Sequence, residues 1–229
     1  VAGQILRTLT TRAETARVFA AVSATEGAFL RYGAMLRLVE GIALDVPLLR
    51  ELGGRLVTGD ARPSAAMQQF RRTVGWFDLR HNGVVHPFVN ALTCWDVHCV
   101  LRLEAWQRRV GRAVRGWFVA LGELEALSSL AGHASDEPGA VFPELVADGP
   151  FFVAEDLGHP LLDAGTRVGN DVTLTEPGRA LMVTGSNMSG KSTLLRAMGL
   201  AVVLAHAGGV VCARRLSLRE LGLGTSIRV

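Results

Sequence analysis

The sequence predicts a chain of two parts, an all-helical amino-terminal region followed by an α/β region. Apolar residues recur three, four and seven positions apart through the first 130 residues or so, which is the period of a buried helix face. Turn-forming residues gather at 135–139, and short apolar runs, a glycine loop and one helical pattern follow them. We therefore predict a helical domain over residues 1–135 and the first part of an α/β domain over residues 136–229.

The helical region divides at its loops. The sequence HNGVVHP at 81–87 contains Asn-Gly, but its flanks do not alternate for long, so we predict a helix–helix connection there and not a hairpin. Gly53-Gly54 is expected to end a helix, or a short continuation after Pro47. We predict four helices, from about Ala13 to Leu49, from an N-cap at Ser64 to about Asp78, from about Val89 to Gly111 and from about Arg112 to Leu130.

Two groups of side chains in these helices have metal-ligand chemistry. Cys94, His98 and Cys99 fall within two turns, but no fourth ligand is near, so core-packed thiols and a satisfied histidine are the favoured interpretation. His81 and His86 have no acidic or cysteine companion at ligand spacing. They are predicted to be solvated loop residues.

The arginines of the third and fourth helices lie on the polar side of the pattern. Glu104, Arg108 and Arg112 are four residues apart and can form an exposed ladder of ion pairs. The same arginines could instead face the phosphates of DNA. We favour the solvated face.

The α/β region begins with strand-like runs at 151–153 and 172–174. The run Ala180–Val183 is continuously apolar, as in a central parallel strand covered on both faces. A helix over 194–206 is apolar almost all round and is therefore expected to be buried, with Gly208-Gly209 ending it. Residues 210–212 are predicted to form the next strand.

Composition limits the classes of protein to which the chain can belong. Hydrophobic residues make up 49% and charged residues 20%, which favours a folded protein over a disordered one. Three cysteines without a disulfide spacing indicate a reducing compartment. Without a signal peptide or a long apolar run, we expect a soluble, cytoplasmic protein with no membrane partner. Because the chain begins with Val1, we expect it to be part of something longer.

The strongest motif is GSNMSGKST at 185–193, which fits the phosphate-loop (Walker A) pattern G-x-x-x-x-G-K-[ST] between an apolar run and a helix. Glycines let backbone N–H groups turn toward phosphates, and the helix that follows adds the positive end of its dipole. Lys191, the only lysine among 24 basic residues, supplies a charge for the β- and γ-phosphates. Ser192 is placed to bind Mg²⁺, and Thr193 can reach the α-phosphate.

Four ordered elements then resemble the MutS DNA mismatch-repair ATPase family. TGSNMSGKST at 184–193 resembles its phosphate loop TGPNMGGKST, and GHPLL at 158–162 resembles its G-[RH]-H-P element. VGNDV at 168–172 resembles its "N-D" segment, and AHAGGVVCA at 205–213 resembles its A-x-x-G-x-x-V-P-A. The helical first part is compatible with the core and lever helices of this family.

The resemblance implies a site for ATP and Mg²⁺. It places Val168 and Asn170 near the adenine and a run of loop residues around the phosphates: Gly185, Ser186, Asn187, Met188, Ser189, Gly190, Lys191, Ser192 and Thr193. Many members carry an aromatic residue one position before the valine, where this chain has Arg167. The resemblance further implies double-stranded DNA as a partner, a homodimer, and ATP binding coupled to a clamp-like movement.

The chain departs from the family pattern in several respects. Its only Phe-x-Glu, Phe142-Pro143-Glu144, lies at the predicted domain boundary and is read as chance, and there is no room for a long DNA-clamp insertion. Glu220 is the only acidic residue after Lys191, so we expect this stretch to bind nucleotide without hydrolysing ATP alone. We also expect the apolar faces around Ala180–Val183 to need covering by further chain or by a partner.

Two other functions remain open from the sequence. One is a P-loop ATPase of the transporter or recombination type whose helices serve a protein partner. The other is a nucleotide-binding module without hydrolysis.

Overall fold

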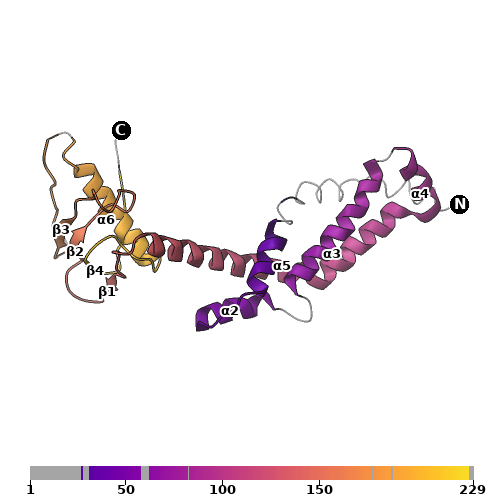
Figure 1. Ribbon diagram of the computed structural model, residues 1–229, viewed down its shortest axis with the longest axis horizontal. Coiled ribbons are helices and arrows are strands. Elements are labelled where there is room, and N and C mark those ends of the chain that lie inside the picture. The colour runs from indigo at the N-terminus through magenta and orange to yellow at the C-terminus, as the bar shows by residue number, and fades with distance from the viewer. Residues whose placement is uncertain are drawn as a thin grey trace. The chain divides into compact units, whose positions relative to one another are not determined.

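The computed structural model describes residues 27, 31–57, 62–81, 83–176, 178–186 and 188–226. The chain divides into two compact units, Val1–Glu125 and Ala126–Val229, each with its own apolar core (Figure 1). The first unit is helical in its described part, and the second contains a four-stranded sheet. The predicted combination of helices with a small sheet is confirmed. A functional division at residue 135 stays a prediction.

The first long helix of the prediction is interrupted. Residues 31–40 are helical, residues 41–46 are not, and α2 runs from Pro47 to Leu56, while residues 1–26 lie outside the described part. Gly53 and Gly54 lie inside α2, so the prediction that they end a helix is wrong. Gly53 is a glycine inside the helix because there is no room for a side chain: a Cβ there would lie 2.5 Å from Cδ1 of Leu44.

Helix α3 spans Pro63–Gly75 and continues as a 3₁₀ helix, η1, over Trp76–His81. Its N-cap is Arg62 and not Ser64, because Pro63 opens the helix at a position where its missing N–H is not needed. Ser64 instead donates its backbone N–H and its hydroxyl to the Glu40 carboxylate, at 2.8 and 2.5 Å. The negative charge of Glu40 thus lies at the positive end of the helix dipole.

The predicted third and fourth helices have different boundaries. Helix α4 covers Val85–Thr93, and α5 is one helix of 42 residues from Trp95 to Asp136. The break falls at Cys94, whose φ of 50° is left-handed, and not at Gly111. Helix α5 continues through Gly111 because buried residues keep helical spacing on both sides of it: Trp106, Val110, Trp117 and Leu121.

His86 is not a solvated loop residue, as the sequence suggested. It lies on α4, and its Nε2 is 2.9 Å from Oδ1 of Asp96, which is buried near the start of α5. Asn90 donates to the other Asp96 oxygen at 3.3 Å and accepts the backbone N–H of Asp96 at 3.0 Å. This network ties α4 to α5 around the left-handed turn at Cys94.

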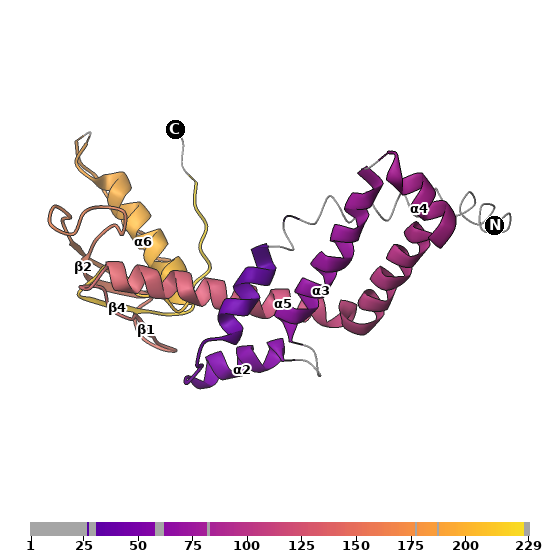
Figure 2. The same ribbon diagram turned by 45° about the vertical axis from the view of Figure 1, so that its right-hand side comes forward.

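Much of the core of the first unit lies between α3 and α5, which run side by side, with α4 joining them at one end (Figure 2). Leu36 of the helix at 31–40 and Leu56 of α2 also belong to it. Phe70 and Trp106 meet with ring centroids 5.0 Å apart, and Nε1 of Trp106 donates to the Ala66 carbonyl at 2.8 Å. Cys99 is buried in the same core, as predicted for a packed thiol, whereas Cys94, for which the same was predicted, is only half-buried. The exposed pair Glu104–Arg108 forms at 3.5 Å.

The sheet of the second unit has the order β1-β4-β2-β3. Its strands are β1 (Glu144–Leu145), β2 (Phe152–Leu157), β3 (Asn170–Leu174) and β4 (Arg215–Leu218). Strand β1 pairs with β4 in parallel, and the other two pairings are antiparallel. The strand predicted at 210–212 is reduced to one bridge between Val211 and Val141, and the strand itself lies further along as β4.

Helix α6 (Lys191–His206) packs on this sheet through Ala197, Ala201 and Val202. It ends as predicted, because Gly208 is left-handed with φ 78° and the Gly209 N–H bonds to the Leu204 carbonyl at 2.8 Å. The prediction that α6 is buried all round is wrong. Leu195 and Val203 on its other side are 55% and 51% exposed.

Candidate phosphate-binding site

The loop before α6 closes around the side chain of Lys191. Its Nζ donates to the carbonyl oxygen of Gly185 at 2.8 Å and to that of Ser186, and it lies 3.4 Å from the Ser189 hydroxyl. The ammonium group is therefore held against the backbone of the loop that precedes it. A fixed positive charge within a ring of backbone groups is suited to a phosphate chain.

The backbone of the loop takes conformations that favour glycine. Gly190 has φ 85°, and Met188, which has a side chain, has φ 66°. A Cβ at Gly185 would lie 2.7 Å from the Ser189 hydroxyl, so a larger residue would displace a group that contacts Lys191. The glycine at each end of the motif thus has a separate steric role.

Helix α6 begins directly after the loop, with Gly190 as its N-cap and no side chain capping its first turn. The Gly190 carbonyl accepts the Leu194 N–H at 2.9 Å, which is the first bond of the helix. The N–H groups of Lys191, Ser192 and Thr193 precede that bond and have no partner within the helix. Together with the helix dipole they form the anion-binding end of an α-helix.

The approach to the loop differs from the prediction. Residues 180–184 are not in a strand, and Leu181 and Met182 are 47% and 84% exposed. A buried parallel strand needs hydrogen-bonding neighbours, and no strand among the described residues pairs with this run. The local loop and helix are present, but the strand that should lead into them is not formed.

The residues expected near adenine lie on another part of the second unit. Val168 is 78% exposed, and Asn170 opens β3 and donates its side-chain amide to the Val168 carbonyl at 3.3 Å. Within the described ranges, no hydrogen bond links either residue to the loop. Asn187 lies outside the described residues.

Arg167 is directed into the second unit. Its guanidinium bonds to the Glu137 carboxylate at 3.0 Å, both side chains are 14% exposed, and this hydrogen bond raises the pKa of Arg167. Gly158 leaves room for it, because a Cβ there would lie 2.4 Å from Cδ of Arg167. Arg167 therefore has a structural role in this chain, at the position where the sequence resemblance would have led us to expect an aromatic residue.

Few protein groups at the loop could bind a metal ion. Ser192 is exposed at the first turn of α6, where its hydroxyl can reach a cation held by phosphates. Where side chains are described, no group of three or more His, Cys, Asp or Glu is placed to hold a metal. These residues fit Mg²⁺ that arrives with a nucleotide better than a resident metal site.

An apolar groove of about 930 Å³ runs along the exposed side of α6. Leu195, Met198 and Val203 line it from the helix, Leu221 and Leu223 line it from the chain after β4, and it reaches Ser192 at the phosphate loop. This groove was not predicted from the sequence, because α6 was expected to be covered on all sides. The sequence does show apolar residues on both faces of α6, but it could not show which of the two faces would remain exposed and form a groove.

Comparison with known proteins shows a sequence similarity over the same residues. The family model described as MutS domain V matches residues 181–223, which include the loop and all of α6. The probable DNA mismatch repair protein Msh6 of Drosophila melanogaster is 40% identical over 104 residues, which is 43% of this chain and 9% of that protein. The chain is MutS-like.

Bacterial relatives give the same result. The DNA mismatch repair protein MutS of Azorhizobium caulinodans is 39% identical over 128 residues, which is 51% of this chain and 14% of that protein. MutS of Paracoccus denitrificans is 41% identical over 114 residues, 46% of this chain and 12% of that protein. The MutS-like chain thus matches about a tenth of the length of these relatives. No helix in its described part has the length and apolar character needed to cross a membrane.

Proposed function

We propose that residues 185–193 bind the phosphates of ATP with Mg²⁺, in the first part of the P-loop ATPase domain of a MutS-like DNA mismatch-repair protein. The position of Lys191 supports this most directly, because its Nζ is held by the Gly185 and Ser186 carbonyls at the start of α6. In this proposal residues 136–229 belong to the nucleotide-binding domain, and residues 1–135 correspond to core and lever helices.

Each loop residue has a role in the proposed site. The backbone N–H groups of Ser186, Asn187, Met188 and Ser189 line the phosphate chain, and Lys191 contributes the charge for its terminal groups. The Ser192 hydroxyl binds the Mg²⁺ that accompanies the phosphates, while Thr193 faces the α-phosphate. Val168 and Asn170 remain the proposed adenine contacts, and since Arg167 is engaged with Glu137 we expect weak selectivity for the base.

Calorimetric titration of ATP with Mg²⁺ into the chain tests the loop. Lys191→Ala removes charge-assisted hydrogen bonds, each worth about 1.5–3 kcal/mol, so we expect affinity to fall at least about ten-fold. Arg179→Ala is the matched control, since it removes one positive charge from an exposed side chain shortly before the loop. The proposal fails if the unmodified chain gives no saturable heat, or if both substitutions weaken binding equally.

The low number of acidic residues after the loop favours a second candidate, nucleotide binding without hydrolysis. Glu220 is the only carboxylate side chain after Lys191, whereas P-loop hydrolysis uses one carboxylate for Mg²⁺ and another group to position water. We expect the 229-residue chain to release no phosphate above background. Turnover that disappears with Lys191→Ala would contradict this.

Double-stranded DNA is the proposed macromolecular partner, and a homodimer the proposed assembly, with ATP binding coupled to a movement of the dimer on DNA. The support is the family resemblance, since the relatives are described as DNA mismatch repair proteins. The cytoplasm remains the expected location. Binding to labelled duplex DNA and sedimentation of the chain with and without ATP test these points separately from the calorimetry.

A further inference from the structure

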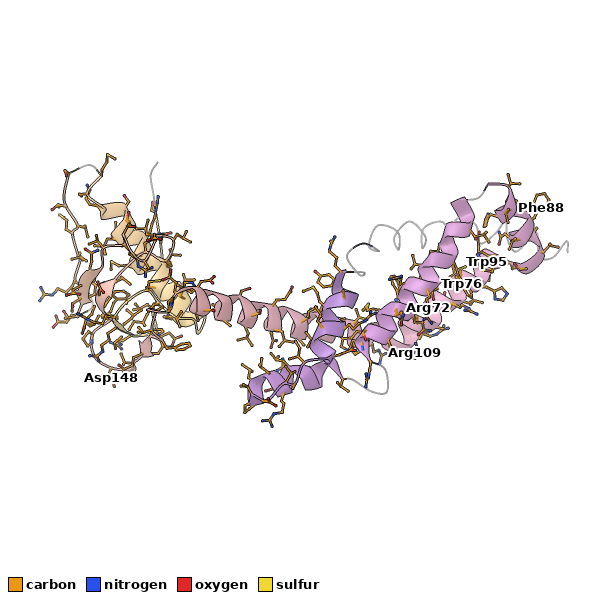
Figure 3. The ribbon with its side chains drawn as sticks, in the orientation of Figure 1. Arg72, Trp76, Phe88, Trp95, Arg109 and Asp148 are labelled. Atoms are coloured by element: carbon orange, nitrogen blue, oxygen red, sulfur yellow. The ribbon has the colours of Figure 1, made fainter. Side chains whose placement is uncertain are left out.

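A hollow of about 650 Å³ lies between α3 and α5 in the first unit, far along the sequence from the phosphate loop. Gln69, Arg72 and Trp76 line it from α3 and the start of η1, and Arg102 lines it from α5. Trp76, Arg72 and Arg109 follow one another in that order along this pair of helices (Figure 3). The hollow therefore combines guanidinium groups with an aromatic wall.

The aromatic wall holds one guanidinium in place. The Arg102 guanidinium lies 4.0 Å from the centroid of the Trp76 ring. Trp76 is itself fixed, because Trp95 stacks with it at 5.3 Å and donates Nε1 to its carbonyl at 3.2 Å. A guanidinium lying over a ring keeps its in-plane N–H donors available, which suits two oxygens of a phosphate.

The surrounding charge is strongly positive. Residues 62–116 contain nine arginines and three acidic residues, a net +6, although the whole chain has only +3. Glu104 pairs with Arg108, and Asp96 with His86. Among the side chains that the structure describes, no carboxylate is left for Arg72 or Arg102, and Arg109 bonds to the neutral Gln69.

We propose that this hollow is a contact site for the phosphodiester backbone of nucleic acid, with Arg72 and Arg102 binding adjacent phosphate oxygens. Arg109 lies seven residues beyond Arg102, about 10 Å along the helix, and extends the site toward the next phosphates. The Trp76 ring is covered by Arg102, so it serves as a support and not as a platform for stacking bases. The contact is therefore independent of base sequence.

This inference rests on the proposed nucleic-acid partner and not on nucleotide binding at the loop. An acidic protein surface fits less well, because planar guanidinium groups placed one after another along two helices match a backbone with regularly spaced phosphates. Duplex and single-stranded DNA share this chemistry. The experiment compares the two.

Fluorescence anisotropy with labelled duplex and single-stranded oligonucleotides, of two unrelated sequences each, tests the site over a range of salt. For Arg72→Ala with Arg102→Ala we expect at least about ten-fold weaker binding to every sequence that the unmodified chain binds. The slope of log affinity against log salt should fall by about 2 for the duplex. Arg102→Lys keeps the charge without the planar fork and should recover part of the affinity.

The matched control is Arg31→Ala with Arg37→Ala, which removes two exposed arginines from the same unit outside the hollow. Circular dichroism melting checks that each variant folds, and ATP titration of the hollow variant should remain unchanged. The proposed site is wrong if the hollow variant binds DNA as the unmodified chain does, or if both double variants lose equal affinity. Either result would still leave DNA as a partner of the chain. If the unmodified chain binds neither form of DNA, site and partner fail together, and the ATP titration still judges the loop.

Discussion

At the scale of single residues, the Cys212 thiol lies beside the partly buried Arg167–Glu137 ion pair and makes the stability of the second unit depend on pH. Burial raises the pKa of its thiol above the ordinary value of 9.0, and the nearby Arg167 opposes this by favouring the thiolate. Above pH 9 the unfolded chain therefore loses a proton that the folded chain still holds. The free energy of unfolding should fall as the pH rises through this window, because the folded state binds more protons.

Urea unfolding of the chain and of Cys212→Ala at pH 7, 9 and 10 measures this contribution. Alanine removes the thiol and leaves a small cavity, so the variant should be less stable at pH 7. Only the unmodified chain has the Cys212 proton to lose. The difference in the free energy of unfolding between the unmodified chain and the variant should therefore become smaller as the pH rises. A difference that stays constant from pH 7 to 10 would show that the thiol does not titrate as inferred.

Residues at the site differ in how far sequence alone could place them. The glycine positions and Lys191 follow from local spacing, and in the structure Gly190 has φ 85° and Nζ of Lys191 donates to the Gly185 carbonyl. The inward direction of Arg167 depends on Glu137, 30 residues away, and on the space left by Gly158. No local pattern contains that contact, so sequence could place the residue only by resemblance.

At the scale of elements, α5 keeps glycines in its interior. Gly116 and Gly122 are exposed, and a Cβ at either position would meet no atom within 4 Å. Glycine in a helix interior costs about 0.5–1 kcal/mol relative to alanine, because it has more freedom in the unfolded chain. These two positions therefore lower the stability of the helix without any steric need.

Gly116→Ala and Gly122→Ala should each raise the free energy of unfolding by about 0.5–1 kcal/mol, measured by thermal melting followed by circular dichroism. Gly208→Ala is the contrasting control. It also has open space for a Cβ, but its φ of 78° should make alanine destabilising. We attribute the effect at Gly116 and Gly122 to helix propensity and the effect at Gly208 to backbone conformation. If all three substitutions changed the stability equally, this explanation would be wrong.

The element boundaries show where pattern reasoning is weak. Gly111 looked like a helix end, but the buried spacing of Trp106, Val110 and Trp117 continues past it, and this tertiary packing outweighs the glycine. Cys94 ends α4 in a left-handed conformation, and a cysteine in a sequence does not predict such a conformation. The apolar run 180–183 had the composition of a central strand, but a strand also needs neighbours, which composition cannot supply.

At the scale of the whole chain, the excess of positive charge and the exposed apolar groove belong to different units. The positive excess lies between residues 62 and 116, whereas the apolar groove lies along α6 in the second unit. A groove of this size with half-exposed leucine and valine side chains favours association, because burying it against another surface removes apolar area from water. Two features of the sequence, an apolar helix and an apolar run at 180–183, agree with a face that needs covering.

We therefore expect the chain to self-associate as its concentration rises, and Val203→Lys to weaken this association by placing a charge in the groove. Light scattering coupled to size-exclusion chromatography, over a wide range of protein concentration, gives the mass of the species present. Val119→Lys is the control, because Val119 is 52% exposed on α5 in the first unit and Val203 is 51% exposed. A mass that stays monomeric at every concentration, or an equal effect of both substitutions, would show that the groove does not drive association.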